Sequence, residues 1–116
     1  DHLLKFGGEE VCLPAYEQDL DKILTRGQFW YGDRYEFIEG EPNGCHRNSS
    51  HLWLDNKDSL LLATGYALSY DGMWRQHTWL IHPRTNYIIE TTAERLAYFG
   101  FVLNLEEAEE FSVFNI

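Results

Sequence analysis

Cys45 is the residue whose type and position most clearly predict chemistry. It follows Gly44 directly, at the start of residues 45–54, which we interpret as a helix. A thiol at a helix N-terminus faces unpaired backbone N–H groups and the positive end of the helix dipole, and both stabilise a thiolate. Arg47 adds positive charge nearby. The sequence therefore predicts a nucleophilic cysteine, with a small buried core residue as the alternative.

His77 and Glu90 fall on two consecutive predicted strands that we expect to form a hairpin. A four-residue turn at 82–85, with Ile81 opposite Asn86, would place Glu90 directly across from His77 on one face. A carboxylate in that position fixes the tautomer and orientation of an imidazole that takes a proton from a thiol. The alternative is a solvated histidine and a solvated glutamate on an outward face.

The elements that must position these residues follow from hydrophobic spacing and turn signals. The Asp71-Gly72 pair between two apolar runs is a strong hairpin signal. In chain order we expect a strand or packed terminus at 3–6, an amphipathic helix at 15–25 stopped at Gly27, an aromatic strand at 28–38 with its rings mostly in the core, the helix at 45–54, strands at 60–70, 73–81 and 87–92, one or two helical turns at 92–99, and an acidic helix face at 106–110.

This order of elements predicts an α+β fold in a single domain spanning residues 1–116. The helices come first, and the Cys45 helix packs on an antiparallel sheet of at least 61–70, 74–81 and 87–92. A chain of this length can bury a substantial core.

The charge balance limits the partners of the protein. Nine Lys and Arg residues against nineteen Asp and Glu residues give a net charge of −10, which repels phosphate backbones and anionic membrane surfaces. We therefore expect no nucleic-acid and no membrane partner. Two cysteines, Cys12 and Cys45, are too few for a disulfide scaffold, although a single disulfide between them is possible. This favours a reducing compartment and a cytoplasmic location, with secretion as a processed chain or effector as the alternative.

The order of these motifs resembles the papain-like thiol hydrolases, most closely their NlpC-like and transglutaminase-like branches. The resemblance covers residues 45–100 and lies in four segments: Gly44–Ser49, Gly65–Leu68, His77–Ile81 and Ile88–Thr92. It implies a minimal papain-like fold with Cys45 as nucleophile, His77 as base and Glu90 as orienting acid. The sequence departs from the family pattern at Glu90, where Asp or Asn is usual, and at Thr78, where Ala is usual.

An oxyanion hole would need two donors, and the backbone N–H of Cys45 is one by geometry. Asn48 and Ser49 are expected to bond within the first turn of the helix instead. The remaining oxyanion or substrate candidates are Asn43, Tyr35, Tyr31 and Trp79.

His46 and His51 invite a zinc site together with Cys45, since imidazole and thiolate suit that metal. Their separation places the two imidazoles on different helix faces, and no paired ligand motif accompanies them. We expect no metal and no cofactor.

Two classes of function fit these residues. The first is a cysteine-dependent hydrolase or acyl transferase acting on an amide bond, as a peptidase, amidase or deamidase, through Cys45, His77 and Glu90. Its substrate would be a peptide or protein amide, with cationic substrates favoured by electrostatic steering. The alternative is a small acidic binding protein of the immunity type, or a papain-like domain without catalysis.

Overall fold

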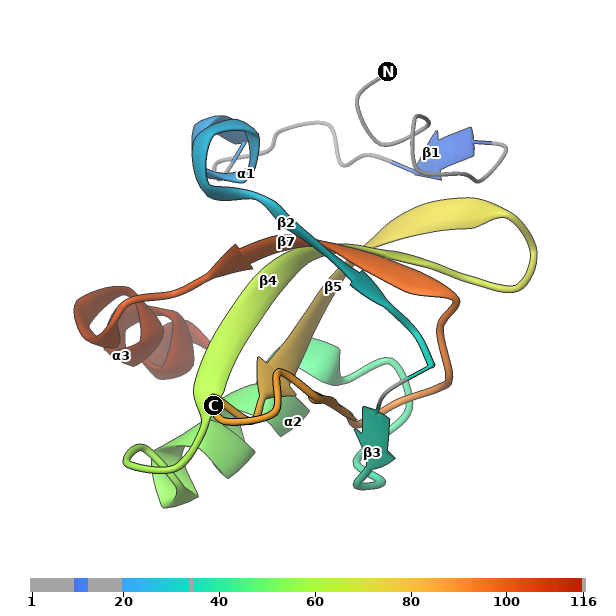
Figure 1. The fold of residues 1–116 in the computed structure, drawn as a ribbon. Coiled ribbons are helices and arrows are strands. Elements are labelled where there is room, and N and C mark those ends of the chain that lie inside the picture. Colours follow the sequence, from blue (N-terminus) through green and yellow to red (C-terminus); the bar gives the residue numbers. More distant parts are fainter. Residues whose placement is uncertain (1–9, 13–19, 34, 116) are drawn as a thin grey trace.

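The computed structural model of the protein describes residues 10–12, 20–33 and 35–115. The strand expected at 3–6 and the first part of the helix expected at 15–25 lie outside the described residues. The elements are β1 (Glu10–Cys12), α1 (Leu20–Arg26), β2 (Gln28–Tyr31), β3 (Tyr35–Phe37), α2 (Cys45–Asp55), β4 (Leu61–Leu68), β5 (Met73–Ile81), β6 (Ile88–Glu90), β7 (Ala97–Val102) and α3 (Leu105–Phe114) (Figure 1).

Within the described residues, seven strands form one mixed sheet. Six follow the order β2-β7-β4-β5-β6-β3, and β1 pairs with β5. The central strands β4, β5 and β6 pair antiparallel, as predicted. The whole sheet is mixed rather than antiparallel, because β1 runs parallel to β5 and β3 runs parallel to β6. These pairings join segments far apart in the chain, which local turn signals do not report.

The β4–β5 hairpin forms at the turn that the sequence predicts. Ser69 N–H donates to the Met73 carbonyl, and Gly72 N–H donates to the Ser69 carbonyl. Gly72 has φ 86°, in the left-handed region that glycine adopts without strain. The turn therefore closes over three residues and sets Gly65 opposite His77.

The β5–β6 hairpin has a different register from the predicted one. Ile81 lies opposite Ile88 rather than Asn86. The turn is longer because His82 N–H still donates to the Tyr87 carbonyl, while Asn86 closes the turn in a left-handed conformation with φ 61°. The slip is two residues, so every side chain keeps its face of the sheet. His77 and Glu90 consequently share a face, but they meet diagonally.

The C-terminal region departs most from the prediction. One or two helical turns were expected at 92–99, but residues 97–102 form strand β7, between β2 and β4. The acidic stretch after it belongs to α3, which begins with a capping box between Asn104 and Glu107. The acidic helix face expected at 106–110 is thus found, but the expectation that helices come first is wrong because β1, β2 and β3 precede α2.

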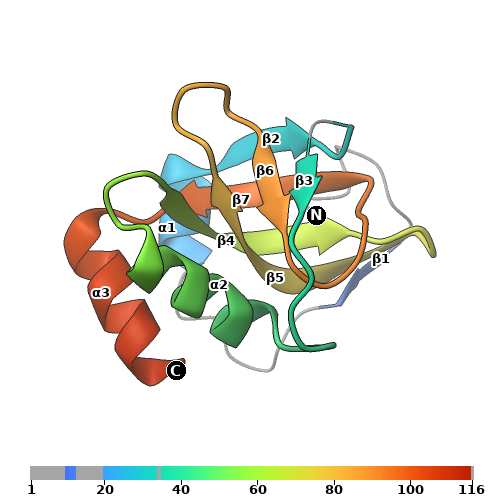
Figure 2. The ribbon, with the colours of Figure 1, turned by 90° about the horizontal axis from the view of Figure 1, so that it is seen from below.

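The three described helices pack against different strands of the sheet (Figures 1 and 2). Helix α2 packs on β5 and β4, α3 packs beside α2, and α1 packs on β7. Two core clusters result. Trp53 of α2 and Phe101 of β7 belong to the larger one, and Trp30, Trp79 and Tyr98 belong to the smaller one. None of the helices in the described residues is long and apolar enough to cross a membrane.

The aromatic segment at 28–38 is less buried than expected. It forms β2 and β3, as a break at Gly32-Asp33 allows. Only Trp30 is buried among its rings, whereas Tyr31 is 73% exposed and Phe37 is 44% exposed. Both strands lie at the outer edges of the sheet. Each therefore has a neighbouring strand on one side only, and its side chains are less covered.

Candidate functional site

Cys45 is the first residue of α2, as predicted, and its thiol is partly exposed and free. Gly44 caps the helix without a side-chain hydrogen bond. The loop before the helix is held by Asn48, whose side chain accepts from the N–H of Glu41 at 3.1 Å and donates to its carbonyl at 2.9 Å. The expectation that Asn48 bonds within the first helical turn is therefore wrong, since its amide fixes the incoming loop instead.

The start of α2 lies against an open stretch of the β5 edge. On the side of β5 away from β4, the described strands β1 and β6 pair only with residues 73–75 and 80–81. Between them, the backbone of Thr78 lies close enough to Cys45 to lower the pKa of its thiol. The hydroxyl of Ser49 donates to the Thr78 carbonyl at 3.3 Å, which corrects the expectation that Ser49 bonds within its own helix. Helix α2 therefore takes the place of a neighbouring strand here.

His77 connects the thiol to the buried acid. Its Nε2 lies 2.8 Å from Glu90 Oε1 and 3.0 Å from Oε2. Its interaction with Cys45 lowers the pKa of the thiol and raises the pKa of the imidazole. Because Nε2 is engaged by Glu90, Nδ1 is the nitrogen left to act on the sulfur. The imidazole is only 2% exposed. The structure thus brings together the three residues that the sequence singled out.

The electrostatics of this group favour a thiolate paired with an imidazolium. Burial raises the pKa of the Cys45 thiol, but the hydrogen bond and positive charge of His77, with the Thr78 N–H, outweigh it and leave that pKa below its usual value. Burial lowers the pKa of His77, and its bonds to Cys45 and Glu90 outweigh burial, so the pKa of His77 is raised. The lowered pKa of Cys45 and the raised pKa of His77 arise from the same interaction, so the two groups titrate as one coupled pair.

Glu90 is completely buried and accepts hydrogen bonds on both oxygens. Tyr98 donates its hydroxyl to Oε1 at 2.7 Å. Oε2 accepts from the N–H of Thr91 at 3.1 Å and from the N–H and hydroxyl of Thr92, each at 3.0 Å. Burial raises the pKa of Glu90, but His77 and these donors bring it down to about 2. With its pKa at about 2, Glu90 is a carboxylate at neutral pH, so the hydrogen between it and His77 resides on Nε2.

The oxyanion and substrate candidates occupy different surroundings. Asn43 is exposed in the loop before Gly44, with φ 61°. Tyr35 donates its hydroxyl to Glu94, which raises the pKa of Tyr35 to about 12. Tyr31 is exposed on β2. Trp79 is completely buried and stacks on the His77 ring with centroids 6.1 Å apart, so it supports the imidazole from within the core.

The two histidines of α2 do not join the thiol in a metal site. His46 Nδ1 is hydrogen-bonded to Thr78 Oγ1, and its ring packs edge-on against Phe111 of α3 at 5.5 Å. His51 lies on the exposed side of α2. Among the described residues, no three of the potential ligands His, Cys, Asp and Glu are grouped so that they could hold a metal ion.

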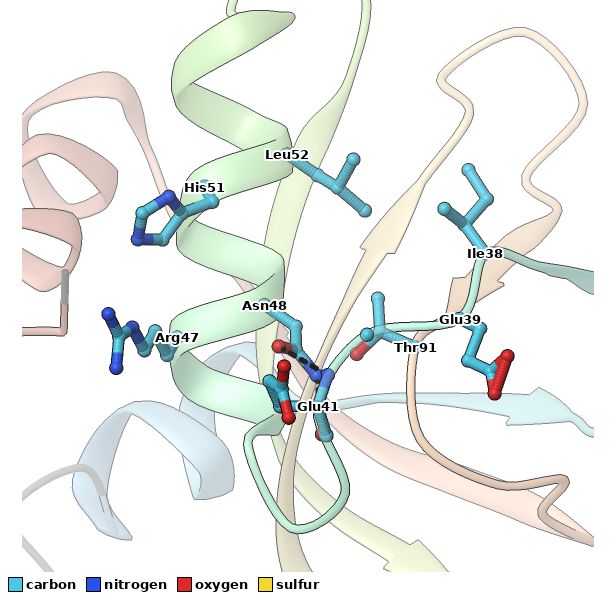
Figure 3. Close-up of a pocket in the computed structure, with 9 residues that line it drawn as sticks. Ile38, Glu39, Glu41, Arg47, Asn48, His51, Leu52 and Thr91 are labelled. Atoms are coloured by element: carbon cyan, nitrogen blue, oxygen red, sulfur yellow. Dashed lines mark hydrogen bonds between the residues drawn. The ribbon is translucent and has the colours of Figure 1, made fainter.

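A groove of about 540 Å³ runs along the flank of α2. Figure 3 shows Ile38, Leu52 and Thr91 on one side of the helix, and Arg47 and His51 on the other. Cys45, His77 and Glu90 are not among the residues that line this groove. Its apolar and polar lining could hold part of an extended ligand.

Two residues of the site were not found by sequence reasoning. Thr92 follows Glu90 in a segment that carried the resemblance, so a threonine next to the acid was a visible signal. Tyr98 gave no usable signal, because its strand β7 had been interpreted as helical turns.

No family model, curated protein or solved structure matches this chain. The function must therefore be argued from the geometry of the residues.

Proposed function

We propose that the protein is a cysteine-dependent hydrolase or acyl transferase that acts on an amide bond. The observation that carries this proposal is the connected series from Cys45 through His77 to Glu90, with the thiol at the start of α2. Burial and the negative charge of Glu90 oppose ionisation of the thiol, but His77 and the Thr78 backbone outweigh them, so the pKa of Cys45 is lowered. The resemblance to papain-like thiol hydrolases agrees with these roles.

The reaction follows from the orientation of the imidazole. His77 Nδ1 takes the thiol proton, and the sulfur of Cys45 attacks the amide carbonyl carbon to form a tetrahedral intermediate. The backbone N–H of Cys45, which has no acceptor within its own helix turn, is placed to donate to the oxyanion. His77 then gives its proton to the amide nitrogen, the C–N bond breaks, and the amine leaves behind a thioester on Cys45.

The second half of the reaction releases the acyl group. Nδ1 of His77 takes a proton from water, and the oxygen attacks the thioester carbonyl. Collapse of this intermediate expels the sulfur, which regains the proton from His77, and the acyl group leaves as a carboxylic acid. An amine in place of water would give transamidation by the same steps. Glu90 keeps the imidazole oriented in both halves.

The net charge of −10 favours cationic substrates through long-range steering. We expect amides within lysine- or arginine-rich peptides to react faster than those in acidic peptides of equal length. This preference should weaken as salt is added, because charge steering is screened over about 8–10 Å at physiological salt.

A small activated ester tests the nucleophile without knowledge of the substrate. With p-nitrophenyl acetate at neutral pH, we expect a burst of nitrophenol and one acetyl group on Cys45, located by mass spectrometry. Cys45→Ala should abolish the burst, and His77→Gln should reduce its rate at least about 10²-fold, since the pair acts as a unit. Peptide anilides with and without lysine then test amide cleavage.

Iodoacetamide provides the matched control within the same chain, because Cys12 is a second cysteine. We expect Cys45 to be alkylated much faster than Cys12 at neutral pH. Slow and equal alkylation of both, with no acetyl-enzyme, would contradict the proposal and favour the acidic binding protein or a non-catalytic domain.

A further inference from the structure

A chain of hydrogen bonds connects the half-buried Arg95 to the buried Glu90 through the hydroxyl of Thr92. The donor and the acceptor of each bond in this chain are determined. Arg95 Nη2 donates to Thr92 Oγ1 at 3.2 Å, and Arg95 Nη1 donates to Ser69 Oγ at 2.9 Å. A guanidinium can only donate. The Thr92 hydroxyl therefore accepts from Arg95 and directs its own hydrogen to Glu90 Oε2. Thr92 is thus held as a donor to the carboxylate.

Tyr98 supplies a second hydroxyl on the other oxygen of Glu90. It is 1% exposed, and its ring packs 4.9 Å from Trp79 and 6.1 Å from the His77 ring. Burial and the negative charge of Glu90 raise the pKa of Tyr98, so the phenol keeps its hydrogen and donates it. The oxygen that accepts from Tyr98 is also the one nearer to His77 Nε2.

We propose that Tyr98 and Thr92 are positioning residues that act on His77 through Glu90. Their hydroxyls fix the carboxylate in one orientation and draw part of its negative charge away from the imidazole. This inference rests on the proposed function, because it assigns the two hydroxyls a role in setting the proton affinity of the base. Neither needs to touch a reacting atom.

The direction of the expected effect follows from the donor role. When one hydroxyl is removed, more negative charge stays on the oxygens that face His77, and the imidazolium becomes more stable. The pKa of His77 therefore rises. If a hydroxyl contributed only to packing, its removal would lower the stability of the fold and leave the titration midpoint of His77 unchanged.

The other charged groups around the pair stay unchanged in these variants. Cys45 faces His77 from α2, Tyr35 faces Glu90 from β3, and Arg95 faces Tyr98 from the loop before β7. Tyr98→Phe leaves all three in place, whereas Thr92→Val also removes the acceptor of Arg95 Nη2. A shift in titration that both variants share therefore reports the missing hydroxyl.

The test is an NMR titration of the His77 imidazole in the full chain. In Tyr98→Phe and in Thr92→Val we expect the midpoint to move upward by about one pH unit. Thr92→Ser keeps the hydroxyl and should titrate like the wild type. Tyr66→Phe, which alters a buried tyrosine of the larger core cluster, is the matched control for loss of a buried phenol and should also leave the midpoint in place.

An unchanged or lowered midpoint in folded Tyr98→Phe and Thr92→Val would overturn the inference. If Tyr98→Phe fails to fold, the Thr92→Val and Thr92→Ser pair decides alone. A wild type that forms no acetyl-enzyme would instead contradict the proposed function, and the His77 titration would still be readable.

Discussion

Replacing Glu90 by glutamine should reverse the tautomer of His77, although the two side chains have nearly the same shape. The introduced amide has one acceptor and one donor end. Two backbone N–H groups and the Thr92 hydroxyl donate at the position of Oε2, so the amide oxygen must lie there. The NH₂ group then faces His77 Nε2 and donates to it. The imidazole hydrogen moves to Nδ1, where it points at Cys45 and blocks proton transfer from the thiol.

The magnitude has a kinetic and a thermodynamic part. A tautomer reversal in a Ser-His-Asp triad lowers kcat by about 10⁴-fold, and we expect a loss of about 10²- to 10⁴-fold in acetylation of Cys45. The pKa of Glu90 lies at about 2 instead of 4.5, so the fold favours the carboxylate by about 3 kcal/mol. The glutamine variant should lose up to about that much stability at neutral pH.

Three measurements on one Glu90→Gln sample separate these effects. Burst kinetics with the activated ester give the acetylation rate, and a denaturant titration gives the free energy of unfolding. The ¹⁵N chemical shifts of the imidazole report which ring nitrogen of His77 carries hydrogen. Glu36→Gln is the matched control, because Glu36 also binds a histidine, His82, but does so at an exposed site on β3.

The result that would refute the reasoning is a folded Glu90→Gln protein whose His77 keeps its hydrogen on Nε2. In that case the donors at Oε2 would not have oriented the amide, and the acid could not be said to choose the tautomer. Normal acetylation together with the reversed tautomer would be equally damaging, since His77 could not then be the base.

Two further predictions concern the fold that holds the site. In Gly100→Ala the new Cβ would lie 2.3 Å from the Thr64 carbonyl oxygen. Because this distance forces β4 and β7 apart, we expect a denaturant titration to show a loss of stability above about 2 kcal/mol. Unchanged stability would contradict the close approach of the two strands. Glu90 and Glu107 both have pKa values lowered to about 2, so the unfolded chain binds more protons than the folded one in acid. Their stabilisation is complete above about pH 4.5 and declines as the pH falls toward 2; melting temperatures across this range should show the decline, which Glu107→Gln should reduce, and a flat profile would contradict it.

The site was more predictable from the sequence than the sheet that carries it. Cys45 was found from a local signal, a glycine followed by helical spacing. His77 and Glu90 were found from parity along two strands, and parity survives a slip of two residues in the register. The actual turn is two residues longer because Asn86 adopts a left-handed conformation. The hydrophobic pattern of the sequence does not predict this conformation.

The parts that the sequence did not predict depend on contacts between distant segments. Residues 92–99 contain Ala, Glu, Arg and Leu, which favour helices, yet the chain from Ala97 onward becomes a strand because it fills the place between β2 and β4. This packing overrides a weak local preference. Tyr98 reaches Glu90 only through that long-range pairing, so the hydroxyl on Oε1 could not be placed from local spacing.

The open stretch of β5 explains why the thiol and the imidazole meet although α2 packs on a different face from His77. Thr78 and His77 are adjacent on β5 and point to opposite faces. Thr78 meets α2 through its hydroxyl bond to His46, while His77 lies with Trp79 on the other side. Cys45 can contact His77 only by reaching past the edge between β1 and β6. A strand paired there would satisfy the Thr78 N–H but close the passage. In this protein the Thr78 backbone instead lowers the pKa of the Cys45 thiol, so the open stretch of β5 also stabilises the thiolate.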